Sequence, residues 1–246
     1  MINLTIENNI ALVRINNPKK LNALSNDLME ELYCKIFGIE KKANVIVITG
    51  CDKAFAAGMD ITEIAQHDYE QTHLQTVINS HWEELLNVKI PVISAVSGYA
   101  LGGGFELVLY SDIVIASEDA KFGFPEINLG VMPGLGGTQL LTRAVGTKRA
   151  SKIIMTGEQL SAQEAYDLGI VSQVVPQDKV IDVATELAYK ISQKPKMSLR
   201  LIKEAIKMSQ NCGLQQGMQI ERTMFHSLFS TTDKQNKINE FLSRKK

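Results

Sequence analysis

Hydrophobic residues form several short runs along the chain that predict β-strands. The runs at 4–6 and 10–15 are separated by Glu7-Asn8-Asn9 and predict a β-hairpin. The run at 45–48 is apolar at every position, which is typical of a strand buried on both faces. Runs at 92–96, 112–116 and 170–175 predict further strands.

Apolar residues at helical spacing, together with capping residues, predict helices in much of the remaining chain. Ser25 is the predicted N-cap of the first helix. The pair Ser161 and Glu164 has the spacing of a capping box, and so does the pair Asp60 and Glu63. Other helices are expected at 69–87, 105–110, 138–145, 147–155, 178–192, 196–209, 213–229 and 232–244.

The order of these elements predicts the fold class. Strands dominate the first part of the chain, and helices follow one another after about Asp178. This separation argues for an α/β core with a helical appendage. We place the boundary after residue 192, which gives a core at 1–192 and a helical region at 193–246.

Composition and charge argue against several classes of function. The 246-residue chain is 45% hydrophobic and 22% charged, as in an ordinary globular protein, and its net charge is −1. This balance creates no field that would attract nucleic acid or anionic lipid, so we expect neither nucleic acid nor a membrane as a partner. No apolar run reaches the ~18 residues that a membrane span needs.

The sequence shows neither a targeting signal nor a metal-ligand pattern. Its N-terminus lacks the charged and apolar regions of a secretory signal and the Arg-rich character of a transit peptide. Cys34, Cys51 and Cys212 are far apart and odd in number, which is typical of reduced thiols. We therefore expect a cytoplasmic protein. The four histidines, at 67, 73, 81 and 226, have no ligand spacing, so no metal site is expected.

A glycine-rich turn at 98–104 joins the run at 92–96 to the short helix expected at 105–110. Its glycines let backbone N–H groups approach a ligand where a Cβ would clash. The first N–H groups of a helix are unpaired, and their positive end favours an anion or a developing oxyanion. Glu106 lies in the first turn of this helix. Met59 lies in another small-residue turn before a helix, and its N–H is a second candidate oxyanion donor.

A second carboxylate, Glu126, follows a proline and precedes a further glycine cluster at 130–137. Two carboxylates beside an oxyanion-type turn suggest acid–base chemistry next to a polarised carbonyl. From the residues alone, Glu106 could instead cap its helix and Glu126 could form a surface ion pair. The glycines could serve tight packing or a dinucleotide site, although G-x-G-x-x-G does not occur. A serine hydrolase is unsupported because G-x-S-x-G is also missing.

Four segments, taken in order, resemble the crotonase superfamily and most closely its enoyl-CoA hydratases. They are residues 53–61, 98–107, 122–126 and 133–138. Each segment alone is moderately specific, whereas their order and spacing together are highly specific. The resemblance extends from the N-terminal hairpin to Phe241.

This resemblance implies a fold and an assembly. Residues 1–192 are expected to form a crotonase-like α/β spiral of repeated ββα units that carries an acyl-CoA site. The all-helical region at 193–246 is expected to help close the active site and to form trimers. The implied assembly is a homotrimer or a homohexamer built as a dimer of trimers.

The resemblance also implies a hydro-lyase that adds water across the 2,3-double bond of a 2-enoyl-CoA, giving a 3-hydroxyacyl-CoA in fatty-acid or related acyl-CoA breakdown. The backbone N–H groups of Met59 and Gly103 would hold the thioester carbonyl. Glu106 would orient and deprotonate the water, Glu126 would deliver the proton, and the Gly134 backbone would help to hold the water. Coenzyme A belongs to the substrate, an acyl-CoA thioester, and no separate cofactor is expected.

Two positions depart from the commoner pattern of these hydratases. Met59 stands where alanine is frequent, so its side chain would narrow the acyl tunnel. Thr62 replaces a frequently basic residue, which leaves Lys20, Lys53 or Arg244 to supply charge for the phosphates of coenzyme A, the last from a neighbouring subunit. The substrate contacts that the resemblance implies are Ala23, Ala57, Asp60, Ile61, Phe241 and Arg244.

Other functions remain open at this point. A Δ3,Δ2-enoyl-CoA isomerase needs a single base, so the presence of both Glu106 and Glu126 favours a hydratase. Another acyl-CoA enzyme of the superfamily would usually change the carboxylate pair. A non-catalytic acyl-CoA-binding or RNA-binding relative is a further alternative, and the near-neutral charge argues against RNA. Trp82 is either a core residue or part of a wall of the acyl pocket.

Overall fold

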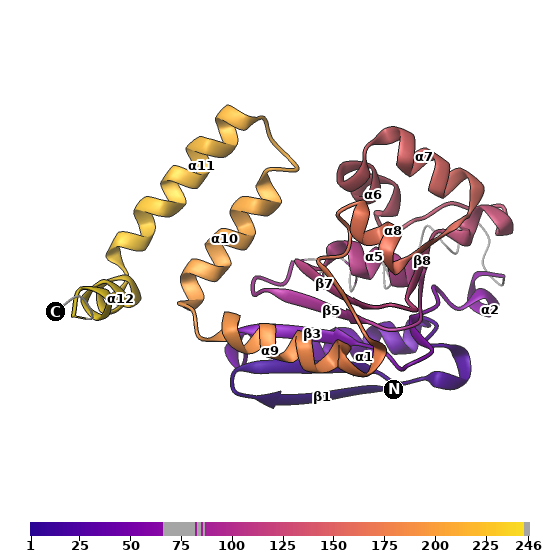
Figure 1. Ribbon diagram of the computed structural model, residues 1–246, viewed down its shortest axis with the longest axis horizontal. Coiled ribbons are helices and arrows are strands. Elements are labelled where there is room, and N and C mark those ends of the chain that lie inside the picture. Colours follow the sequence, from indigo (N-terminus) through magenta and orange to yellow (C-terminus); the bar gives the residue numbers. More distant parts are fainter. Residues whose placement is uncertain (66–81, 83–84, 86, 244–246) are drawn as a thin grey trace.

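The computed structural model describes residues 1–65, 82, 85 and 87–243. In this part of the chain an α/β core with two sheets is followed by helices that extend away from it (Figure 1). The mixed α/β class is therefore confirmed. The helix predicted at 69–87 lies outside the described residues except for Trp82, Leu85 and Asn87, and His67, His73 and His81 also lie outside them. Among the described helices, none has the length and apolar character needed to cross a membrane.

The larger sheet has the strand order β1-β2-β3-β5-β7-β10. The β1–β2 hairpin is antiparallel, as predicted, and every other neighbouring pair is parallel. Asn8 and Asn9, with φ of 51° and 61°, close the hairpin in the left-handed region that asparagine tolerates. The last strand is shorter than the predicted 170–175. The strands are Ile2–Glu7, Ile10–Ile15, Val45–Thr49, Val92–Val96, Ile113–Ser117 and Gln173–Val175.

A second sheet, which the apolar runs did not predict, has the order β4-β6-β8-β9. Its strands are only three residues long, and one of them lies inside the predicted glycine-rich turn. From β3 to β8 the chain alternates between the sheets, placing β3, β5 and β7 in the larger one and β4, β6 and β8 in the smaller one. The short strands are Ala54–Ala56, Tyr99–Leu101, Lys121–Gly123 and Gln159–Ser161.

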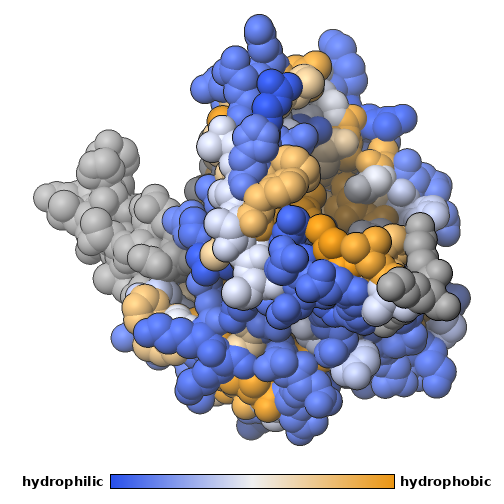
Figure 2. Space-filling view, turned by 90° about the vertical axis from the view of Figure 1, so that its left-hand side faces the viewer, coloured by the Kyte–Doolittle hydropathy of each residue, from blue (hydrophilic) through white to orange (hydrophobic). Residues whose placement is uncertain are grey.

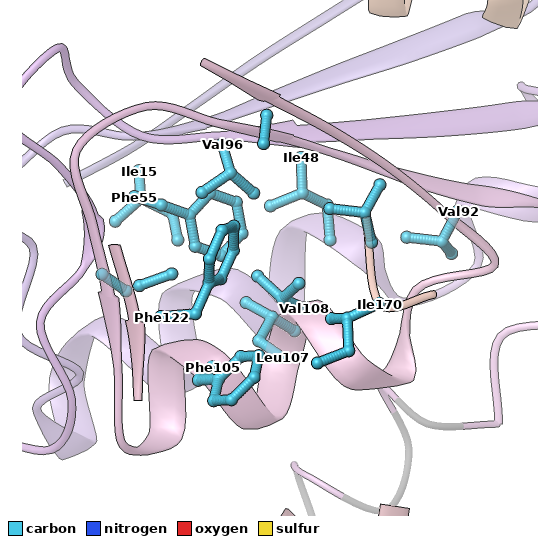
Figure 3. Packing of buried hydrophobic residues seen from close by; sticks show 14 of the residues in the cluster. Ile15, Ile48, Phe55, Val92, Val96, Phe105, Leu107, Val108, Phe122 and Ile170 are labelled. Atoms are coloured by element: carbon cyan, nitrogen blue, oxygen red, sulfur yellow. The ribbon is translucent and has the colours of Figure 1, made fainter. Parts of the chain in front are cut away.

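The two faces of the larger sheet are covered by different elements. Val45 and Val47 of β3 pack with α9 on one face, whereas Ile46 and Ile48 belong to the larger cluster on the other face. Helix α5 lies within that larger cluster, between the two sheets, with Phe105 against Phe122 (Figure 3). The predicted burial of β3 on both faces is thus confirmed.

Helix boundaries agree with the predictions to within two residues, and some caps differ. Ser25 caps α1 by accepting from Leu28 N, and Ser161 forms the expected capping box. Asp60 caps α2, but the Glu63 carboxylate binds Asn26 N instead of completing a capping box. The helices are α1 (Asn26–Ile36), α2 (Ile61–Ile64), α5 (Gly103–Tyr110), α6 (Gly137–Val145), α7 (Thr147–Thr156), α8 (Ala162–Asp167), α9 (Val180–Ser192), α10 (Lys196–Met208), α11 (Leu214–Ser227) and α12 (Thr232–Ser243). Short 3-10 helices lie at Pro18–Lys20, Ile39–Lys41, Pro125–Leu129 (η3), Gln177–Lys179 and Leu228–Ser230.

Helix α10 is attached to the core by lysine side chains. Lys203 Nζ lies 2.7 Å from Asp112 Oδ2 and donates to the Ile90 carbonyl at 2.9 Å, and Lys196 Nζ donates to the Ala43 carbonyl at 2.9 Å. Helices α11 and α12 continue beyond α10, away from the sheets (Figure 1). The C-terminal helices therefore leave part of their surface uncovered by their own chain.

Gly104 is the point of closest approach between α5 and β4. A Cβ there would lie 2.1 Å from the Ala56 carbonyl oxygen, which is backbone and cannot turn aside. We expect Gly104→Ala to lower the free energy of unfolding by about 3 kcal/mol, because overpacking forces the backbone apart. Urea denaturation measures this change. Gly217→Ala in α11, whose Cβ would meet only Cys212 Sγ at 3.5 Å, is the control and should not destabilise. A Gly104→Ala variant as stable as the control would contradict the prediction.

Candidate active site

Two glycine turns, from segments far apart in the sequence, lie against each other. Gly58 precedes Met59 with φ of 105°, and Gly102 precedes Gly103 with φ of 51°. A Cβ on Gly102 would lie 3.5 Å from Gly58 Cα, and one on Gly58 would lie 3.2 Å from the Leu101 carbonyl oxygen. Side chains at either turn would push the two segments apart. The structure thus brings together the two backbone N–H groups that the sequence identified as candidates.

Each of these N–H groups belongs to a peptide whose carbonyl is already held. The Gly58 carbonyl accepts from Leu24 N at 2.8 Å, and the Gly102 carbonyl accepts from Glu106 N at 2.9 Å. In a trans peptide the N–H points away from the C=O, so these bonds fix the directions of the Met59 and Gly103 N–H groups. Neither N–H donates to any acceptor in the part of the chain that the structure describes. Gly103 is also the first residue of α5, where the helix dipole favours negative charge.

The buried side chain of Asn22 ties the first of these turns to the N-terminal segment. Its Nδ2 donates to the Ala54 carbonyl at 2.8 Å and to the Phe55 carbonyl at 3.2 Å, and its Oδ1 accepts from Asn17 N at 2.7 Å. Asn22 is fully buried and has φ of 57°. Strand β4, which leads to Met59, is thereby anchored from the side. Sequence reasoning did not single out Asn22, because the two carbonyl groups of β4 to which it donates lie more than 30 residues away.

Glu106 is buried, with 1% of its surface exposed, and one of its oxygens is held by a neighbouring turn. Its Oε1 accepts from Leu135 N and from Gly137 N, both at 2.7 Å. Burial raises the pKa of this carboxyl, and the two N–H donors oppose that rise by stabilising the carboxylate. Two donors on one oxygen leave the other oxygen for a further partner. Glu106 can therefore act as an oriented carboxylate.

The turn that holds Glu106 depends on two glycines. A Cβ on Gly137 would lie 2.5 Å from Phe124 Cζ and 3.0 Å from Glu106 Oε1. Gly136 has φ of 109°, and a Cβ there would lie 2.5 Å from Tyr110 Oη. The sequence marked this glycine cluster but not its contact with Glu106. Gly136 and Gly137 come just before a predicted helix, and Glu106 lies in an otherwise apolar helix earlier in the chain. This combination is the signal that could have suggested the contact between the turn and Glu106.

Glu126 lies in η3, and its carboxyl reaches the Gly102 turn. A Cβ on Gly102 would lie 3.0 Å from Glu126 Oε1. Glu126 Oε2 is buried and has no hydrogen-bond partner among the described residues. Burial raises the pKa of Glu126 to about 7, and the nearby Glu106 carboxylate adds to the rise by repulsion. Near neutral pH this carboxyl therefore holds its proton for part of the time and can act as an acid.

Asp60, the N-cap of α2, is a carboxylate held by three donors. Its Oδ2 lies 2.6 Å from Lys20 Nζ, and its Oδ1 accepts from Thr62 N at 3.0 Å and from Thr62 Oγ1 at 2.6 Å. The hydrogen bond from Lys20, followed by those from Thr62, lowers the pKa of Asp60 to about 2. The charge of Lys20, which the sequence offered for a phosphate contact, is thus shared with Asp60 in this structure.

We expect Asp60→Asn to lower the free energy of unfolding at pH 7 by about 1–2 kcal/mol, because asparagine keeps one acceptor oxygen but loses the charge and the second acceptor oxygen. Since the pKa of Asp60 is lower in the folded chain than in the unfolded chain, its contribution is complete above about pH 4 and is lost as the pH falls through about 2. Urea unfolding at several pH values measures the difference. It should shrink below pH 4, whereas Asp119→Asn, at an exposed position, should change stability little at any pH. A pH-independent difference for Asp60→Asn would contradict the assignment.

The remaining predicted site residues fall into two groups. Ala23 and Ala57 are half-buried beside the Met59 turn, Ile61 is exposed at the start of α2, and Gly134 is exposed next to Leu135. Phe241 instead lies on α12, at the opposite end of the molecule from α2 (Figure 1). Arg244 lies outside the described residues. The structure therefore does not bring Phe241 to the other site residues within one chain.

Comparison with known proteins gives consistent results. The model of the family described as enoyl-CoA hydratase/isomerase matches residues 5–246. A probable mitochondrial enoyl-CoA hydratase of Dictyostelium discoideum is 43% identical over 238 residues, which cover 96% of this chain and 86% of the relative. The 2,3-dehydroadipyl-CoA hydratase of Escherichia coli is 41% identical over 238 residues, covering 96% and 93%. A crystal structure of an enoyl-CoA hydratase subunit from Geobacillus kaustophilus has a TM-score of 0.95 and 42% identity, covering 99% of this chain and 95% of that chain.

Proposed function

Because the chain belongs to the enoyl-CoA hydratase/isomerase family, we propose that Glu106, Glu126 and the two free N–H groups catalyse the hydration of a 2-enoyl-CoA. The family resemblance seen in the sequence is confirmed. The protein is an enzyme of the hydro-lyase type that hydrates an enoyl-CoA. What carries the proposed roles is one observation: two touching glycine turns each lead to an unpaired N–H group, the Glu126 carboxyl reaches one of these turns, and Glu106 lies on the helix that the same turn begins.

The thioester carbonyl binds, in this proposal, between the N–H groups of Met59 and Gly103. These donors withdraw electron density from C3 of the acyl chain and stabilise the enolate charge that develops on the carbonyl oxygen. Because their peptides are held by other bonds, the donors need no reorganisation during the reaction. One preorganised donor of this kind contributes about 3 kcal/mol to lowering the barrier.

The two carboxyl groups divide the proton transfers. Glu106, with one oxygen held by two N–H groups, is suited to the anionic form, so it orients a water and takes its proton as the oxygen attacks C3. Glu126, with its raised pKa, delivers a proton to C2. The product is a 3-hydroxyacyl-CoA. The two carboxyls interact, so the apparent pKa values of the rate profile belong to the pair.

Substrate contacts and the water site extend this proposal. The backbone at Gly134, next to the turn that holds Glu106, helps to hold the water. Ala23, Ala57, Asp60 and Ile61 border the Met59 turn and contact the substrate. The chemistry uses only peptide donors and carboxyl groups, so we propose no cofactor besides the coenzyme A of the substrate.

We propose that α10–α12 form the interface of a homotrimer or of a homohexamer made of two trimers, and that the region at 193–246 is specialised for this. Large apolar side chains on these helices are exposed in the single chain, and a groove of about 760 Å³ lies between α10 and α11. Figure 2, viewed from this side, shows hydrophobic residues around a hollow. Apolar surface of this kind marks association sites. The exposed residues include Ile202, Ile206, Leu214, Phe225, Phe229 and Phe241.

Assembly also bears on the two contacts at the C-terminus. Since α12 lies far from the Met59 turn of its own chain, Phe241 can contact a substrate only from a neighbouring subunit. Light scattering should give the mass of three or six chains, and a monomer would contradict the interface.

We propose a cytoplasmic enzyme of fatty-acid or related acyl-CoA breakdown.

The decay of the 2-enoyl thioester absorbance with crotonyl-CoA tests the function directly. Fast decay, with a 3-hydroxyacyl-CoA as the product, supports the proposal. If crotonyl-CoA is inert, longer and dicarboxylic 2-enoyl-CoAs are the next substrates. Failure with all of them, together with isomerisation of a 3-enoyl-CoA, would assign the site to an isomerase instead.

A further inference from the structure

Trp82, the only tryptophan of the chain, contacts the turn that holds Glu106. It is 3% exposed, and its indole Nε1 donates to the Leu135 carbonyl at 3.1 Å. The sequence left Trp82 open between a core residue and a wall of the acyl pocket. Its bond to a backbone carbonyl in a glycine turn suggests a more specific role.

Three successive peptide groups of this turn form hydrogen bonds with two side chains, Glu106 and Trp82. The first donates its N–H, that of Leu135, to Glu106 Oε1, and the third donates the N–H of Gly137 to the same oxygen. The middle peptide carries the Leu135 carbonyl, which accepts from Trp82. The indole thus holds the one peptide of the three that does not contact Glu106. Rotation of the middle peptide would move both flanking N–H groups.

Tyr110 supports the same turn from the other side. Its ring meets that of Trp82 edge-on, with centroids 5.9 Å apart and planes at 79°. Its Oη lies where a side chain on Gly136 would be, 2.5 Å from the position of that Cβ. Tyr110 lies one helical turn after Glu106 on α5. The turn at 135–137 is therefore confined between Glu106, Tyr110 and Trp82.

We propose that Trp82 is a positioning residue for the hydration reaction: its indole N–H fixes the turn at 135–137, and through the turn it fixes the Glu106 carboxylate. This inference rests on the proposed function for its kinetic consequences. Its structural part, the coupling of Trp82 to Glu106, can be measured without any substrate.

Trp82→Phe keeps an aromatic ring and removes only the donor and part of the volume. We expect kcat to fall roughly 10- to 100-fold with little change in KM, because a misplaced catalytic group costs rate rather than binding. The acidic limb of the pH profile of kcat/KM should move to higher pH. Weaker hydrogen bonds from Leu135 N and Gly137 N stabilise the Glu106 carboxylate less, so the pKa of Glu106 rises. The titratable groups facing Glu106 in the described residues are Glu126 from η3 and Tyr110 from α5, and neither is changed by this substitution.

Two comparisons separate positioning from a general loss of stability. Ile153→Val, in the core of α7, is a matched destabilising control that should leave the pH profile in place. In a Glu106→Gln background, adding Trp82→Phe should lower kcat/KM by less than twofold, because the group it positions is already gone. An unshifted pH profile, or a full additional loss in the double variant, would overturn the inference.

A measurement on the intact protein covers the case in which Trp82→Phe does not fold. Growth with 5-fluorotryptophan labels only Trp82, because the chain has no other tryptophan. The single ¹⁹F resonance should shift with pH in the wild type and in Glu126→Gln, and should stop titrating in Glu106→Gln. A resonance that is insensitive to pH, or that follows Glu126 alone, would overturn the inference. Hydration can fail while this titration is still seen, so failure of the proposed function is distinguishable from failure of the coupling.

Discussion

Replacing Glu106 with glutamine should lower kcat/KM for the hydration of crotonyl-CoA by about 10³-fold, the effect expected when a general base is lost. Glutamine fills the same space, and its Oε1 can still accept from Leu135 N and Gly137 N. Its other terminal group is then an amide NH₂, which cannot take a proton from water. The chain should therefore bind substrate and fold while failing in the chemical step.

The decay of the thioester absorbance measures this loss, and the KM value reports whether binding is kept. A suitable control is Glu118→Gln, at an exposed position, which should retain wild-type rates. If Glu106→Gln kept more than a tenth of the wild-type kcat/KM, Glu106 would not be the base. A rise in KM with unchanged kcat would instead assign Glu106 to substrate binding.

Glu126→Gln should cause a loss of similar size, about 10³-fold, because an amide cannot deliver a proton to C2. The wild type should also lose activity as the pH rises above about 7, since Glu126 acts in its protonated form and its pKa is raised to about 7. Above this pH the carboxyl is ionised and cannot act as the acid. The basic limb of the pH profile of kcat/KM measures this, and activity that persists unchanged to pH 9 would contradict the acid role.

The same substitution should have the opposite effect on stability. The pKa of Glu126 is higher in the folded chain than in the unfolded chain, so its contribution to stability is complete at low pH and is lost as the pH rises through about 7. Glu126→Gln removes a buried charge that has an unpartnered oxygen, and it should raise the Tm at pH 8 but not at pH 4. Lower activity combined with higher stability is the result expected for a residue retained for catalysis.

The two carboxyls reach different protonation states because their surroundings differ. Burial raises the pKa of both carboxyl groups, but only Glu106 has two backbone donors that oppose the rise. Glu126 has a buried oxygen without a partner, and it faces the charge of Glu106. The proposed division into base and acid therefore rests on hydrogen bonding in the turn at 135–137, which Trp82 supports through the Leu135 carbonyl.

Much of the local structure could be predicted because its causes lie within a few residues. The β1–β2 hairpin follows from its apolar runs and asparagine turn, and α1 begins where Ser25 can cap it. The continuous apolar run of β3 gave its burial on both faces. The glycine turns and the two glutamates were also visible as a pattern, and the order of the motifs identified the family.

The strands of the second sheet could not be placed from apolar runs, because strands of three residues carry no measurable periodicity. Strand β6 looked like part of a turn, and the last strand, β10, begins at Gln173, later than its apolar run. These strands exist because parallel neighbours from distant segments supply their hydrogen bonds. The capping box predicted at Asp60 failed for a related reason: Asn26 N, 37 residues away, competes for the Glu63 carboxylate.

The sequence alone thus determined the mixed α/β class and the family and singled out the two carboxylates as candidates, since these depend on residue types and their spacing. Only the tertiary structure decided that Gly58 and Gly102 touch, that Leu135 and Gly137 hold Glu106, and that the pKa of Glu126 is raised to about 7. Burial, the direction of an N–H group and the field of a neighbouring charge depend on what lies within a few ångströms in space. Those neighbours come from segments that are far apart in the sequence, and no local pattern encodes their meeting.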